Sequence, residues 1–161
     1  MKRAKLLFFG AVAGICLLLC FLLGVPWTEQ ETQPETTVTL SVSETGQTLT
    51  LPLEEYVAGV LLAELTPSHH PACFRALAVA VRTLAVKNQG VLSDDPGVFQ
   101  GYWTAQTASA KLGEAYPAAL EQAQAAARDT DGLVLTYQGE LALTTYFACS
   151  SGATCASQWV W

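Results

Sequence analysis

Twenty uncharged residues near the N-terminus, Leu6–Val25, limit the possible folds more than any other part of the sequence. A helix of that length can just cross the hydrocarbon core of a bilayer, which is roughly 30 Å thick. Lys2, Arg3 and Lys5 precede the run, so we expect a single-pass membrane anchor with a cytoplasmic N-terminus and a domain outside. A cleaved signal peptide is the alternative, but its apolar core is normally shorter, and no small-x-small cleavage site precedes Pro26.

The rest of the chain reads as a linker and one domain. Residues 28–36 carry no apolar side chain and have nothing to bury, so we expect a polar linker between residues 1–27 and a domain over residues 37–161. The full length of 161 residues leaves room for one ordinary domain. Beyond the apolar run, 5 of the 8 basic residues remain against all 14 acidic ones. This acidic balance argues against nucleic-acid binding.

Hydrophobic periodicity predicts the elements of that domain. Strand-like alternation interrupted by turn residues predicts hairpins over residues 38–51 and 133–147. Helical spacing bounded by proline, glycine or asparagine predicts helices over residues 52–64, 72–88 and 117–128. The predicted fold class is therefore α+β, with an N-terminal transmembrane helix followed by one mixed domain of helices packed on short antiparallel strands.

The first predicted helix places a carboxylate at the end of its apolar stripe. Apolar residues recur at helical spacing from Leu53 to Leu61, and the next position in the series is Glu64. Burial disfavours the charged form of a carboxyl group, and a general acid must hold its proton near neutral pH. Glu64 is therefore a candidate acid, unless the helix ends earlier and the side chain reaches solvent.

Two further patterns suggest polar or aromatic site residues. Arg75 and Arg82 lie seven residues apart on one side of the central helix. A buried arginine is rarely unpaired, so we hypothesise that Arg82 pairs with a carboxylate or holds backbone at the site; a surface arginine with a packed aliphatic stem is the alternative. Tyr102 and Trp103 follow Gln100, and they could stack on sugar rings or pack in the core.

Histidine and cysteine give no metal motif. His69, His70 and Cys73 lack a fourth ligand at suitable spacing, so we predict no metal, and the sequence has no nucleotide-binding fingerprint that would predict a cofactor. Cys149 and Cys155 could form a disulfide outside the membrane, which would leave Cys73 buried and inert.

Several segments together resemble the SpoIID/LytB family, the stage II sporulation protein D domain. The most specific are Leu51–Val60 (LPLEEYVAGV), Ala63-Glu64, Arg75-Ala76 and Ala78–Thr83. Further segments match the family in the same order along the chain. They are residues 95–97 with Gln100, 130–137, 146–147, 150–154 and 160–161. The resemblance covers about residues 37–161. Family domains continue beyond the final Val-Trp pair, so we expect this one to be incomplete.

The resemblance implies a lytic transglycosylase that cleaves peptidoglycan glycan strands, stripped of stem peptides, to 1,6-anhydro-muramoyl ends during engulfment in sporulation. The family's catalytic acid matches Glu64. We expect the glycan to be bound by Arg82, Gln100, Tyr102, Ser150, Ser151, Gly152 and Thr154. Some clostridial relatives hold zinc through a His-Cys pair where this chain has Val98 and Phe99, so no zinc is expected.

Two other functions stay open. One is a non-catalytic wall-binding or amidase-enhancer module, which would recruit a cell-wall amidase or another sporulation hydrolase. The other is a plain structural domain.

Overall fold

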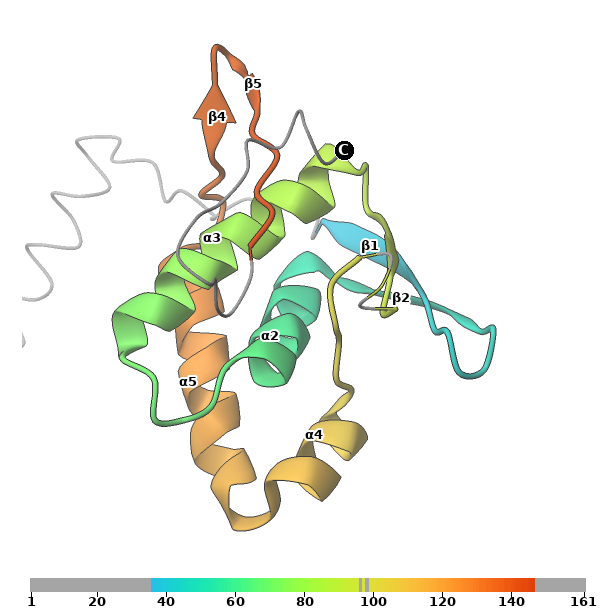
Figure 1. The fold of residues 1–161 in the computed structure, drawn as a ribbon, viewed down its shortest axis with the longest axis vertical. Coiled ribbons are helices and arrows are strands. Elements are labelled where there is room, and N and C mark those ends of the chain that lie inside the picture. Colours follow the sequence, from blue (N-terminus) through green and yellow to red (C-terminus); the bar gives the residue numbers. More distant parts are fainter. Residues whose placement is uncertain (1–35, 96, 98, 147–161) are drawn as a thin grey trace, which may run out of the picture. The chain divides into compact units, whose positions relative to one another are not determined.

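The computed structural model describes residues 36–95, 97 and 99–146 (Figure 1). These residues form a mixture of helices and strands. In chain order the elements are β1 (Thr37–Ser41), β2 (Thr48–Pro52), α2 (Leu53–Glu64), α3 (Pro71–Lys87), β3 (Val91–Ser93), α4 (Ala105–Leu112), the 3-10 turn η1 (Gly113–Ala115), α5 (Tyr116–Asp129), β4 (Thr136–Tyr137) and β5 (Glu140–Leu141).

The predicted transmembrane helix and single-pass location need correction. Across residues 36–95, 97 and 99–146, none of the helices combines the length and the apolar character that crossing a bilayer requires. The apolar run that suggested the anchor, residues 6–25, lies outside the described residues, as does the predicted linker up to residue 35. The residues that the structure describes form a domain of mixed helices and strands.

The main sheet has three strands in the order β2-β1-β3. β1 and β2 form the antiparallel hairpin that alternation predicted, with Val38 opposite Leu51 and Leu40 opposite Leu49. β3 pairs with β1 in parallel, which differs from the expected antiparallel sheet. The parallel pairing follows from α3, because the chain leaves the sheet at β2, crosses it through two helices and returns beside β1.

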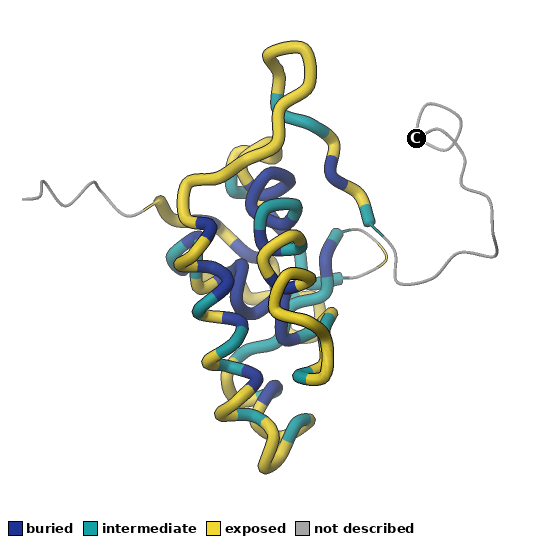
Figure 2. The backbone as a smooth tube through the Cα atoms, turned by 90° about the vertical axis from the view of Figure 1, so that its left-hand side faces the viewer, coloured by how far each residue is buried: buried dark blue, intermediate teal, exposed yellow. Residues whose placement is uncertain are grey.

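The core lies where the helices meet the sheet. α2 packs against α3, α5, α4 and β1, so it is the most central element (Figure 1). Its buried side chains include Tyr56, Val57, Val60 and Leu61, each fully shielded from solvent. Figure 2 shows buried residues gathered on the helices, whereas the β4–β5 hairpin is exposed along most of its length. Most of the core is therefore made by helix side chains, and α2 has neighbouring elements on several sides.

Arg82 is the largest fully buried side chain, and it ties three segments together. Its Nε donates to Oε1 of Glu54 in the first turn of α2 at 2.7 Å. Its Nη2 donates to the carbonyl of Ala127 at 3.0 Å, and its Nη1 donates to Oγ1 of Thr130 at 3.2 Å and to the carbonyl of Leu133 at 3.3 Å. The hypothesis that Arg82 pairs with a carboxylate is confirmed. Arg75, seven residues earlier, is exposed.

Replacing Arg82 by Gln should lower the free energy of unfolding by about 3 kcal/mol, near the lower end for breaking a buried ion pair because Glu54 is partly exposed. Urea denaturation measures the change. Arg75→Gln on the exposed turn of the same helix is the matched control, with an expected change within about 0.5 kcal/mol. Equal stability of the two variants would show that Arg82 does not hold the segments together.

Candidate functional site

Glu64 is the last residue of α2, and its side chain is exposed. The helix reaches Glu64, because the N–H of Leu65 still donates to the carbonyl of Leu61 at 2.9 Å. The predicted burial of Glu64 is nevertheless wrong. The apolar stripe ends with the helix, and the chain turns away into the loop around Pro67, so nothing from α2 covers the carboxylate. A solvent-facing carboxylate at a helix end can meet a substrate directly.

A buried hydrogen bond anchors the segment that passes beside Glu64. The hydroxyl of Tyr56 donates to Oε1 of Gln100 at 3.1 Å, and Gln100 is only 4% exposed. The ring of Tyr102 stacks on the ring of Tyr56, with centroids 5.8 Å apart and planes 8° from parallel. Two side chains of this segment are thus fixed on one residue of α2.

Gly59 makes that close approach possible. A Cβ atom built at Gly59 would lie 2.2 Å from Cε2 of Tyr102, so only glycine leaves room for the ring. The N–H of Trp103 donates to the carbonyl of Gly59 at 3.2 Å. One turn further along α2, a Cβ at Gly101 would lie 3.6 Å from Oε1 of Glu64. The segment from Gln100 to Trp103 therefore lies along α2 from Gly59 to Glu64.

Tyr146 completes the cluster from the segment after β5. Burial raises the pKa of Tyr146, and the neighbouring Glu64 carboxylate raises it further. Burial likewise raises the pKa of Tyr56, with smaller contributions from Tyr146, Tyr102 and Glu64. For Tyr102, burial and then the charge of Glu55 raise the pKa to about 12. Each phenol therefore keeps its proton at neutral pH.

The structure brings Gln100 into the cluster with Tyr146 and Glu64. Tyr102 stacks on Tyr56 beside Gly59 and has Glu55 as its charged neighbour, and Arg82 lies elsewhere. Arg82 binds Glu54, ten residues before Glu64, which is about 15 Å along a helix. The other predicted glycan contacts (Ser150, Ser151, Gly152 and Thr154) and the predicted disulfide (Cys149 with Cys155) lie outside the described residues. Sequence reasoning missed Tyr56, which it took for a core position, and Tyr146. The available signal for Tyr146 was its place in the family resemblance.

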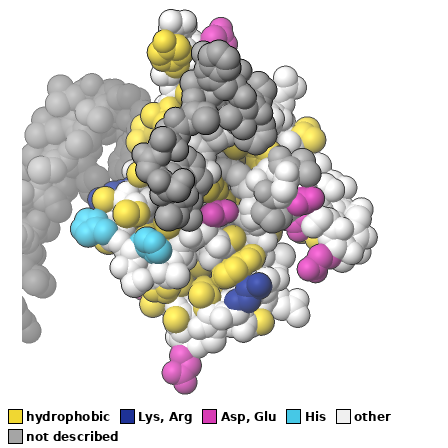
Figure 3. All heavy atoms as spheres, viewed as in Figure 1, with side chains coloured by type: hydrophobic (Ala, Val, Ile, Leu, Met, Phe, Trp, Pro, Cys, Tyr) yellow, Lys and Arg dark blue, Asp and Glu magenta, His cyan; other side chains and the backbone are white. Residues whose placement is uncertain are grey.

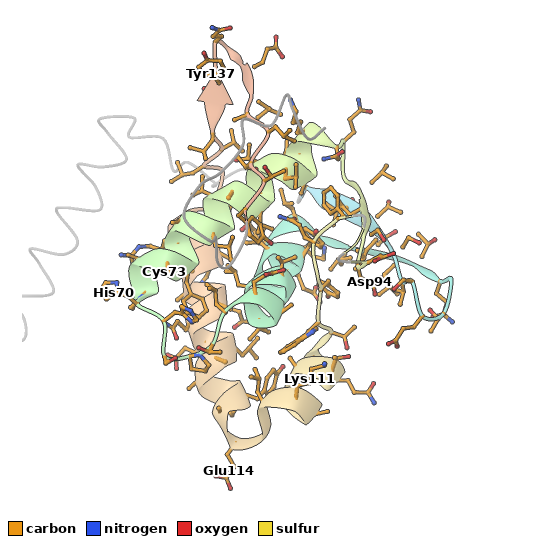
Figure 4. All side chains as sticks on the ribbon, in the orientation of Figure 1. His70, Cys73, Asp94, Lys111, Glu114 and Tyr137 are labelled. Carbon is orange, nitrogen blue, oxygen red and sulfur yellow. The ribbon has the colours of Figure 1, made fainter. Side chains whose placement is uncertain are left out.

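The residues around the start of α3 have local roles. Nδ1 of His70 accepts a hydrogen bond from the N–H of Ala72 at 3.1 Å and so caps the helix. Nδ1 of His69 lies 3.1 Å from the N–H of Thr66. Cys73 is exposed, so its predicted burial is wrong; Figure 4 shows it beside His70 at the same end of α3. It lies on the first turn of the helix, before the helix reaches the core.

A groove of about 420 Å³ lies on the other side of α2, between α4 and α5. Tyr102, Trp103 and Tyr116 line it, with Gln124 and Arg128 among its polar residues. Its α2 wall includes Leu62, which is two residues and so about 200° around the helix from Glu64. Nζ of Lys111 lies over the ring of Trp103, 4.9 Å from the ring centroid, in a cation–π contact. Figure 4 labels Lys111 on α4, and Figure 3 shows a basic side chain there among hydrophobic ones.

Comparison with known proteins identifies the family. The model of the stage II sporulation protein family, SpoIID, matches residues 41–137, which is more than half of the chain. The chain belongs to the SpoIID family. The matched range includes Glu64, Arg82, Gln100 and Tyr102, while Tyr146 follows it. The chain is therefore a member of a sporulation protein family, as its sequence motifs suggested.

Two curated relatives are similar over most of the chain. They are the stage II sporulation protein D of Bacillus subtilis (strain 168) and that of Bacillus amyloliquefaciens, each 31% identical over 121 residues. The match covers 69% of this chain and 35% of each relative. The chain thus spans about a third of the length of the relatives that it matches.

Gly59→Ala tests whether the packing of Tyr102 on α2 is as tight as the contacts indicate. In an open helix position this change would stabilise the protein by up to about 1 kcal/mol. Here the new methyl group overlaps the Tyr102 ring, so we expect a loss of about 1 to 3 kcal/mol in the free energy of unfolding. In a Tyr102→Ala background the same substitution should be neutral or stabilising. A destabilisation of equal size in both backgrounds would contradict the contact.

Proposed function

We propose that this SpoIID-family protein is a peptidoglycan lytic transglycosylase. Its substrate is the glycan strand without stem peptides, its products carry 1,6-anhydro-muramoyl ends, and the reaction serves engulfment during sporulation. The supporting observation is the Glu64 carboxylate, exposed at the end of α2 and flanked by the buried side chain of Gln100 and by the half-buried Tyr146, whose hydroxyl oxygen is buried. A fixed wall beside an exposed carboxylate suits proton transfer to a bound polymer.

The chemistry needs one carboxyl group. Protonated Glu64 donates its proton to the glycosidic oxygen, and the bond between that oxygen and the anomeric carbon breaks. The C6 hydroxyl of the same muramoyl sugar attacks the anomeric carbon and returns its proton to the Glu64 carboxylate. A glycoside hydrolase normally uses a second carboxyl group to activate water or to act as nucleophile. Here the sugar supplies its own nucleophile, so the proton cycle closes on Glu64.

The remaining predicted residues have different parts in this proposal. Ser150, Ser151, Gly152 and Thr154 are proposed contacts of the glycan. Arg82 acts indirectly, because its guanidinium is used up by Glu54 and by α5 and is 1% exposed. Its role is to keep α2 in position, and with it Glu64.

Glu64→Gln should reduce the formation of anhydro-muramoyl ends on denuded glycan strands at least about 100-fold, because an amide cannot donate the proton. Chromatography and mass spectrometry of the digest measure it. Glu114→Gln is the matched control, since Glu114 is exposed on η1 away from the cluster (Figure 4). Binding to purified cell walls should persist in both variants. Full activity of Glu64→Gln would exclude this mechanism.

A second candidate function has one observation in its favour. The groove lined by Tyr102, Trp103 and Tyr116 offers aromatic faces of the kind on which sugar rings stack, and it lies away from Glu64. The chain would then be a non-catalytic wall-binding module that recruits a cell-wall amidase or another sporulation hydrolase.

Trp103→Ala separates the two functions. If the groove binds the wall, this variant should weaken sedimentation with purified peptidoglycan by about 10-fold or more, as the loss of an aromatic anchor does at other interfaces. Glu64→Gln should sediment like the unmodified protein. If Trp103→Ala sediments normally while keeping its fold by circular dichroism, the groove is not the wall-binding surface.

A further inference from the structure

Two buried polar atoms beside Glu64 have no hydrogen-bond partner among the described residues. They are Nε2 of Gln100 and the hydroxyl oxygen of Tyr146. Buried polar atoms are normally paired, because leaving them unpaired forfeits the hydrogen bonds that they make with water. Both atoms belong to the cluster around Glu64, where Tyr146 lies beside Gln100 and Glu64. Neither atom is accessible to a substrate, so each can affect the reaction only through a hydrogen bond to a neighbouring side chain.

The neighbouring groups determine which of these atoms donates a hydrogen bond and which accepts one. The hydroxyl of Tyr56 donates to Oε1 of Gln100, so the carbonyl end of the amide is already engaged. What remains is an NH₂ group, which can only donate. The Tyr146 oxygen can accept from it and still has one proton to donate. A carboxyl oxygen that carries no proton can only accept, and in either protonation state Glu64 has such an oxygen next to Tyr146.

We infer that Tyr146 is the positioning residue of Glu64, with Gln100 Nε2 donating to the Tyr146 oxygen and the Tyr146 hydroxyl donating to one oxygen of the Glu64 carboxyl group. Tyr56 holds the other end of this chain of hydrogen bonds through Gln100. The inference rests on the proposed function, because it assigns the residue that orients the proposed acid.

The position of Glu64 allows this contact to form on binding. The side chain is exposed at a helix end, so it can turn toward Tyr146 without moving the backbone. Catalytic hydrogen bonds are commonly long or poorly aligned in the unliganded protein and tighten in the substrate complex. With Tyr146 on one carboxyl oxygen, the proton to be transferred sits on the other, which faces the glycan. The raised pKa values of Tyr56 and Tyr146 keep both hydroxyls as donors throughout this cycle.

Tyr146→Phe removes the hydroxyl and keeps the ring. On denuded glycan strands we expect kcat to fall by about 10- to 100-fold, as for a displaced catalytic group, while KM stays within about 2-fold. The melting temperature should be unchanged or higher, because the lost hydroxyl has no hydrogen-bond partner among residues 36–95, 97 and 99–146. Tyr137→Phe is the matched control, since Tyr137 is 71% exposed on the β4–β5 hairpin (Figure 4). It should leave kcat, KM and melting temperature unchanged.

Tyr56→Phe tests the far end of the chain of hydrogen bonds. It should lower kcat less than Tyr146→Phe, and the double variant should be no slower than Tyr146→Phe alone, because both act through one contact. If the kcat losses of the two single variants multiply in the double variant, the two hydroxyls act independently, and the proposed chain of hydrogen bonds is wrong.

The outcomes also separate this inference from the proposed function. If Glu64→Gln abolishes activity and Tyr146→Phe keeps its kcat, the inference fails and the proposed function stands. If Tyr146→Phe loses melting temperature and its kcat loss disappears at low temperature, the hydroxyl is structural and the inference fails. If the unmodified protein forms no anhydro ends, or Glu64→Gln remains active, the proposed function fails and the inference with it.

Discussion

The guanidinium of Arg82 is the interaction on which the arrangement of the helices depends. It lies on α3, binds Glu54 in the first turn of α2, and donates to the carbonyls of Ala127 at the end of α5 and of Leu133 beyond it. A buried guanidinium is tolerated only when its donors are used, so these segments must meet in one geometry. α2 is thereby fixed at its start, and its far end carries Glu64. By fixing α2, the hydrogen bonds of Arg82 therefore also determine where the proposed acid, Glu64, lies.

Local patterns in the sequence predicted much of the fold. The helices expected over residues 52–64, 72–88 and 117–128 appear as Leu53–Glu64, Pro71–Lys87 and Tyr116–Asp129, because apolar spacing and the flanking proline, glycine and asparagine residues act locally. The short parallel strand β3 was not predicted, because its pairing depends on α3 returning the chain to the sheet. α4 was missed as well, since only one of its residues, Ala108, is buried and no apolar stripe marks it.

The site was predictable in its residues and less so in its geometry. Glu64 was selected by helical spacing, but its burial depends on what packs beyond the end of α2, which no periodicity reveals. The approach of Tyr102 to α2 depends on the missing side chain of Gly59, a contact between segments more than forty residues apart. Tyr56 fits the apolar stripe so well that its hydroxyl, which holds Gln100, was overlooked.

Digestion of denuded glycan strands in ¹⁸O-labelled water tests the central claim most directly. If the C6 hydroxyl of the sugar attacks the anomeric carbon and gives its proton to Glu64, water takes no part in the reaction. Mass spectrometry will then find anhydro-muramoyl ends without the label. New reducing ends that carry ¹⁸O would show hydrolysis, which requires an activated water, and would contradict the single-carboxylate mechanism.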